Sequence, residues 1–104
     1  PECGMRHLIA ALHPTPAVAG TPRAEAMRLI AELEPFDRGL YAGCAGWFVG
    51  DGDGDAAVTI RSALVRGTDA TLWSGAGIVR HSDAEAEERE TRVKLQTMLD
   101  VLGA

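Results

Sequence analysis

A charged helix near the carboxyl end constrains this chain most. Ser82 is followed three residues later by Glu85, which is a capping box, so we expect a helix to begin there. At about 3.6 residues per turn, one face of its first turns carries four polar side chains, Glu87, Glu90, Thr91 and Lys94. An adjoining apolar stripe, expected to turn inward, consists of Leu95, Met98, Leu99 and Leu102. Two carboxylates and one amine are therefore expected beside the core-facing side, where charge is normally excluded.

These charges have two interpretations. A solvated face of glutamate and lysine side chains, supported by i,i+4 pairs, is ordinary on surface helices, and composition alone favours it. A hard cation such as Mg²⁺ also takes carboxylate oxygens in such places. The rest of the chain favours the second interpretation, in which these carboxylates bind a metal ion.

Composition describes one acidic, soluble globular unit. The chain has 104 residues, 46% of them hydrophobic, and a net charge of −5. The excess of acid argues against nucleic acid or an anionic membrane as a partner, because like charges repel. Cys3 and Cys44 are too few and too unpatterned for a disulfide framework or a zinc site, so we expect a reducing, cytoplasmic location. The apolar run over 8–12 is too short for a membrane span.

The order of elements predicts an α+β fold. Helices are expected over 5–12 and 21–34, with an extended, proline-rich segment over 13–16 between them. Three strands rich in β-branched and aromatic residues are expected over 40–49, 57–65 and 71–79. Turns at 51–55 and 66–69 join them, so we expect an antiparallel meander with helices on one face. With the last helix, the order is α-α-β-β-β-α.

Two apparent motifs do not carry their usual function. The aspartates of the 51–55 turn imitate a calcium-binding EF-hand loop, but Ala56 and Ser62 stand where that loop needs glycine and glutamate. A solvated hairpin turn is the better interpretation. Gly75 and Gly77 do not form a dinucleotide fingerprint, because the third glycine is absent. They can still expose backbone amides before a helix, which suits a carboxylate.

Arg61 lies within the second expected strand. Period-two alternation places Val58, Ile60 and Leu64 on one face and Arg61 on the other. Its guanidinium either reaches solvent or holds a substrate carboxylate in a bidentate fork. The residues alone leave both interpretations open.

The chain resembles the carboxyl-terminal part of the chorismate-utilising enzymes in several ordered blocks. They are LHPTPAV (12–18), IAELEPFDR (30–38), GLYAG (39–43), GW (46–47), TIR (59–61), GAGIV (75–79) and the helix at 87–99. The resemblance is strongest to isochorismate synthases, particularly the siderophore-pathway type, and runs from about residue 8 to 102. Matching order and spacing are far more specific than any single block. The resemblance implies that 1–104 is an incomplete chorismate-binding domain, roughly the last quarter of an α/β/β/α sandwich.

The resemblance implies a metal and a carboxylate-binding group. The cofactor would be Mg²⁺, with Glu90 as a ligand and Glu87 completing the site or holding its water shell. Arg61 and Lys94 would bind the carboxylates of chorismate. The backbone amides that would help them lie near Gly75 and Gly77.

The resemblance also implies a substrate wall in the first half of the chain. Tyr41 would contact the enolpyruvyl side of chorismate. Ala17 and Val18, beside His13, would line the ring pocket.

The family's general base, general acid and other metal glutamate would all lie upstream, so no catalytic residue is assigned within these 104 residues. The chain begins with Pro1 and not Met, which also indicates a piece of a longer enzyme. We expect the missing part of the same enzyme as a partner, a monomeric full-length protein, and no nucleic acid or membrane partner.

Three functions remain open. The first is a fragment, inactive by itself, of an isochorismate synthase that converts chorismate to isochorismate for siderophore or menaquinone biosynthesis. A salicylate synthase shares nearly every motif and differs by a later elimination of pyruvate. Anthranilate-type relatives fit less well, because the chain has Thr15-Pro16-Ala17 and Thr21-Pro22 where they carry other patterns. The third is a non-catalytic, truncated module.

Overall fold

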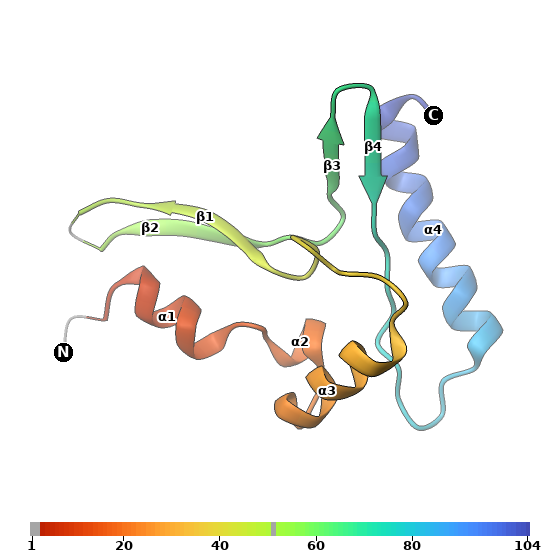
Figure 1. The fold of residues 1–104 in the computed structure, drawn as a ribbon, viewed down its shortest axis with the longest axis horizontal. Coiled ribbons are helices and arrows are strands. Elements are labelled where there is room, and N and C mark those ends of the chain that lie inside the picture. Colours follow the sequence, from red (N-terminus) through yellow and green to blue (C-terminus); the bar gives the residue numbers. More distant parts are fainter. Residues whose placement is uncertain (1–2, 51) are drawn as a thin grey trace. The chain divides into compact units, whose positions relative to one another are not determined.

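A computed structural model describes residues 3–50 and 52–104, which form two compact units (Figure 1). One unit reaches to Thr59 and the other runs from Ile60 to Ala104. The first contains α1 (Met5–Leu12), α2 (Pro16–Ala19), α3 (Arg23–Leu33), β1 (Cys44–Phe48) and β2 (Gly54–Val58). The second contains β3 (Ala63–Arg66), β4 (Asp69–Leu72) and α4 (Ala84–Leu102). Helices with antiparallel strand pairs confirm the expected α+β class.

Prolines set the ends of the first helices. His13 is extended because Pro14 follows it, and α1 ends at Leu12 as expected. Pro16 opens α2, a single turn that replaces part of the extended segment predicted over 13–16. Proline is well suited to a first helical position, since its fixed φ suits a helix and its missing N–H is not needed there. The α3 helix ends at Leu33, two residues before Pro35, close to its predicted end.

The strands pair as two hairpins, and the predicted three-stranded meander is wrong in this respect (Figure 1). In the first hairpin β1 pairs with β2, with Cys44 opposite Val58 and Phe48 opposite Gly54. The second pairs β3 with β4, from Ala63 opposite Leu72 to Arg66 opposite Asp69.

The middle predicted strand, 57–65, breaks at 59–62. Thr59 is still bonded to the segment before β1, because its carbonyl accepts from the Ala42 N–H at 2.9 Å and its N–H donates to the Gly43 carbonyl at 3.0 Å. Arg61 then adopts φ 47°, and a left-handed residue cannot continue an extended strand. The third predicted strand also shortens, ending at Leu72, because Gly75 and Gly77 have no side chains to pack and weaken it.

Close approach of β1 to β2 explains the glycines of this hairpin. A Cβ at Gly46 would clash with the Asp55 carbonyl, and one at Gly54 would clash with the Trp47 carbonyl. The hairpin therefore requires glycine on both strands. Asp51, which belongs to the predicted 51–55 turn, lies outside the described residues.

Few apolar side chains are fully buried within the described chain. Only Ala19, at 3% exposure, and Ala42, at 8%, count as buried hydrophobic residues there. Trp47 and Ile78 are 61% and 73% exposed. Among the residues described, no helix combines the length and apolar character that crossing a membrane requires.

The α4 helix begins one residue later than its predicted cap. Asp83 is the N-cap, and its carboxylate accepts from the Ala86 N–H at 2.9 Å. The Ser82 hydroxyl instead accepts from the Val79 N–H at 3.0 Å and closes the preceding turn. At the other end, Gly103 adopts φ 72° and the Ala104 N–H bonds the Leu99 carbonyl, which ends the helix.

Candidate functional site

One face of α4 carries the polar group that the sequence predicted beside the apolar stripe. Glu87, Thr91 and Lys94 are half-buried, and Leu95, Met98 and Leu99 continue the same side in the same environment. Glu90 and Leu102 are exposed, so these two predicted members of the face are not part of its half-buried surface. The charged residues that point away from it are Glu85, Glu88, Arg89 and Arg92.

The glycine segment after β4 is anchored on this face. The Ser74 hydroxyl donates to the Thr91 carbonyl at 2.9 Å, and the Lys94 ammonium donates to the Gly75 carbonyl at 3.1 Å. The structure therefore brings Lys94 to the Gly75 carbonyl, while the role expected for backbone amides near Gly75 stays a prediction. Gly77 lies beyond this contact and is exposed.

Lys94 also forms an ion pair. Its Nζ lies 2.6 Å from Oε1 of Glu90, with the lysine side chain 29% exposed and the glutamate 56% exposed. An ammonium has three N–H donors, so one remains for a further group after Glu90 and Gly75. The Lys94 ammonium therefore lies between the Glu90 carboxylate and the glycine segment.

Arg61 occupies a strained position before β3. Among the described residues, only Ala42 and Arg61 are non-glycine residues with positive φ. Such a conformation costs on the order of 1–3 kcal/mol and is found preferentially at functional sites. The expected mid-strand location of Arg61 is wrong, and its exposed side chain leaves the chain at a turn.

Arg38 organises the predicted substrate wall of the first unit. Its Nε and Nη2 donate to both oxygens of Glu34, at 2.7 and 2.5 Å. Its Nη1 donates to the Val18 carbonyl at 3.3 Å, and its guanidinium carbon lies 5.6 Å from the centre of the Tyr41 ring. The hydrogen bond to Glu34 raises the pKa of Arg38 above its usual range, against the opposing effect of burial. Val18 and Tyr41 are thus joined through one side chain, and Ala17 lies exposed beside Val18 on α2.

The sequence prediction did not include Arg38 or Glu34. Their i,i+4 spacing across the end of a helix, three residues before a tyrosine, is a signal that could have identified them.

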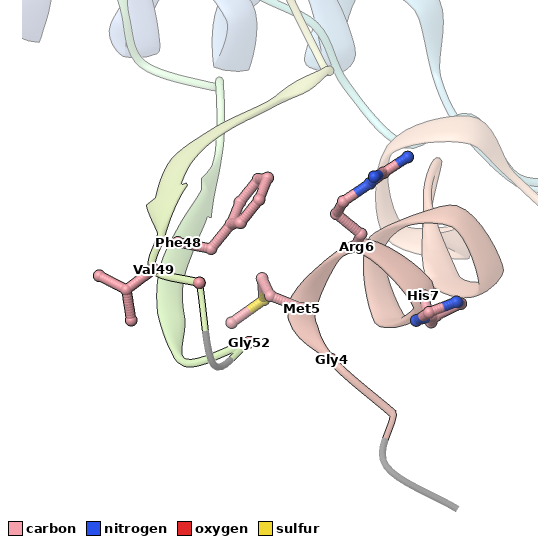
Figure 2. Close-up of a pocket in the computed structure, with 8 residues that line it drawn as sticks. Gly4, Met5, Arg6, His7, Phe48, Val49 and Gly52 are labelled. Carbon is pink, nitrogen blue, oxygen red and sulfur yellow. The ribbon is translucent and has the colours of Figure 1, made fainter.

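A separate hollow of about 290 Å³ lies between the start of α1 and the β1–β2 hairpin (Figure 2). Met5 and Phe48 point toward one another there, while Val49 points away. The Met5 N–H donates to the Gly52 carbonyl at 3.2 Å and holds the two elements together. The hollow includes none of the predicted site residues.

Comparison with known proteins identifies the family. The family model described as "Chorismate binding enzyme" matches residues 1–103. The chain belongs to the chorismate-binding enzymes. The predicted resemblance is confirmed.

Individual members of the family align closely with the chain. The isochorismate synthase EntC of Escherichia coli K12 is 53% identical over 92 residues, covering 88% of this chain and 24% of that protein. The isochorismate synthase DhbC of Bacillus subtilis 168 is 47% identical over 103 residues, covering 99% and 26%. A solved structure of the isochorismate synthase DhbC from Bacillus anthracis superposes with a TM-score of 0.95 at 48% identity, covering 99% of this chain and 28% of that one. The chain thus spans about a quarter of the length of these relatives.

The donor set on α4 fits one side of a Mg²⁺ site in a chorismate-binding enzyme. Glu87 and Glu90 are one helical turn apart, and Mg²⁺ is commonly bound by one or two carboxylates, with substrate oxygens and water as its other ligands. No group of three or more His, Cys, Asp or Glu side chains that could hold a metal occurs in the part of the chain that the structure describes. Any further protein ligands would come from outside the described residues.

Proposed function

We propose that this chain is the carboxyl-terminal part of a Mg²⁺-dependent isochorismate synthase, which converts chorismate to isochorismate for siderophore or menaquinone biosynthesis. The observation that carries the proposal is 53% identity to an isochorismate synthase across nearly the whole chain. The position of Lys94 between Glu90 and the glycine segment agrees with the role that the resemblance implies for it.

The substrate carries two carboxylates, and the second unit supplies cations for them. Lys94 has a free N–H donor after its bonds to Glu90 and Gly75, and Arg61 presents a planar fork suited to a carboxylate. Backbone amides near Gly75 and Gly77 would add neutral donors. In the first unit Tyr41, Ala17 and Val18 would form the wall against the enolpyruvyl group and the ring.

Glu87 and Glu90 would hold the metal through their carboxylates. When bound, Mg²⁺ would act as a Lewis acid and neutralise a carboxylate of the substrate. In this arrangement Lys94 has two tasks, because it holds Glu90 in place and offers a donor to the substrate.

The reaction adds water at one end of the ring's diene system while the existing hydroxyl leaves from the other. It therefore needs a base for the water and an acid for the hydroxyl. Lys94 is the only lysine of the chain, and its ammonium already donates to the Glu90 carboxylate and to the Gly75 carbonyl. We assign both proton transfers to the part of the enzyme upstream of this chain, and substrate orientation to the chain itself.

The test is product analysis with the full-length enzyme that carries this segment. Chorismate and Mg²⁺ should give isochorismate, and removing the metal with a chelator should stop the reaction. Accumulation of salicylate and pyruvate would identify a salicylate synthase. Absence of any chorismate turnover with metal present would contradict the proposal.

A further inference from the structure

We propose that Arg38 is a positioning residue that holds the two sides of the chorismate wall, Val18 and Tyr41, in register. This inference rests on the proposed function, because it takes those two residues as the substrate wall. The role we assign to Arg38 is to position these residues through its contacts with Glu34, Val18 and Tyr41.

The first reason is the geometry of the guanidinium. Two of its nitrogens are used by the Glu34 carboxylate, a third reaches the Val18 carbonyl, and its carbon lies over the Tyr41 ring. Only a planar fork can make these contacts at once, and a lysine ammonium cannot bind bidentately and stack in the same position. Arg38 therefore connects α2, the end of α3 and the loop before β1.

The second reason is where these contacts lie. Ala19 and Ala42, the only buried hydrophobic residues of the described chain, are the sequence neighbours of Val18 and Tyr41. Because few apolar side chains are fully buried here, the polar contacts of Arg38 add to packing in fixing the two segments. The pair is also shielded, because the Arg38 and Glu34 side chains are 24% and 27% exposed.

The same part of the chain offers a matched control. Arg28 and Glu32 form another i,i+4 pair on α3, at 2.8 Å, but their side chains are 62% and 60% exposed. None of the described hydrogen bonds of Arg28 reaches Val18 or Tyr41. Exposed pairs of this kind contribute little to stability.

The experiment compares Arg38→Lys with Arg28→Lys in the full-length enzyme, measuring KM and kcat for chorismate and the melting temperature. Loosening a wall that binds the substrate in its ground state should raise KM about 5- to 20-fold, with kcat changed by less than about threefold. Arg28→Lys should leave both constants as in the wild type. In a Tyr41→Leu background the effect of Arg38→Lys on KM should shrink, because coupled residues do not act additively.

Glu34→Gln is the second variant, and it covers the case in which Arg38→Lys does not fold. It keeps the shape of the side chain and one acceptor for Arg38, so we expect a smaller rise in KM in the same direction. An unchanged KM in the folded variants, with only a lowered melting temperature, would show a purely structural role and overturn the inference while leaving the proposed function intact. A wild-type enzyme that does not convert chorismate would overturn both.

Discussion

Lys94 and Arg38 show how single residues organise this chain. Each binds one glutamate on or next to a helix and one backbone carbonyl of a separate segment. A cation with several donors can therefore tie a loop to a helix where apolar burial is small. Arg61 contributes differently, through a left-handed backbone that places its side chain at a turn.

Glu90→Gln in the full-length enzyme tests the metal assignment. Glutamine is nearly isosteric and a similar helix former, so the free energy of unfolding should change by less than about 1 kcal/mol. Activity should fall at least about 100-fold, and the Mg²⁺ concentration for half-activity should rise, because a charged metal ligand is lost. Turnover, Mg²⁺ dependence and melting temperature are the measurements.

Glu88→Gln is the matched control, since Glu88 also forms an i,i+4 pair at 2.6 Å, with Arg92, on the same helix. It lies on the exposed side and should retain full activity. Equal, mild effects at both positions would mean that Glu90 belongs to an ordinary solvated face.

The same Glu88–Arg92 pair predicts a pH dependence. The hydrogen bond from Arg92 lowers the pKa of Glu88 from its ordinary 4.5. A folded-state pKa below the unfolded one means that the pair stabilises the fold above about pH 4.5, and that this contribution is lost as the pH falls through the lowered value. NMR titration should show the pKa of Glu88 returning toward 4.5 in Arg92→Gln, and partly so at high salt, because the pair lies at the surface, where salt screens it. A pKa that does not change in Arg92→Gln would contradict this.

At the scale of elements, the N-cap of α4 has a measurable contribution. Asp83→Ala removes the acceptor for the Ala86 N–H and should cost about 1 kcal/mol of unfolding free energy in the full-length protein, within the usual range for caps. Ser82→Ala, which affects only the preceding turn, should cost less. Denaturant unfolding of both variants tests this. A larger loss of unfolding free energy for Ser82→Ala than for Asp83→Ala would show that Ser82 is the N-cap, as the sequence predicted.

The elements differ in how far local sequence determines them. Proline positions and helical periodicity were sufficient for α1, α3 and α4, because helix ends depend on nearby residues. The break at Arg61 could not be predicted from alternation, which carries no information about φ. The link from Arg38 to Val18 could not be predicted for a related reason, although the i,i+4 pairing of Arg38 with Glu34 could. The contact of Arg38 with Val18 joins positions 20 residues apart, and no local pattern reports such a pair.

At the scale of the whole chain, exposed apolar surface predicts association. Large hydrophobic residues stay exposed on several elements, including Trp47, Phe48 and Ile78. Apolar side chains exposed to water favour association, because contact with another apolar surface removes them from water. The isolated 104-residue chain should therefore self-associate at high concentration and bind a hydrophobic dye. Sedimentation and dye fluorescence would test this, and a monodisperse monomer with cooperative thermal unfolding would contradict it.

The isolated chain should also be catalytically silent. The chain spans about a quarter of the length of its isochorismate synthase relatives. Our proposal places the base and the acid outside it, and a positioned proton-transfer group typically contributes about 100- to 10,000-fold to a rate. Incubation of the purified chain with chorismate and Mg²⁺ should give no isochorismate above the uncatalysed background. The full-length enzyme, assayed in parallel at equal molar concentration, is the positive control. Multiple turnovers by the chain alone would show that it contains its own acid and base, and Lys94→Met would then ask whether its single lysine is one of them.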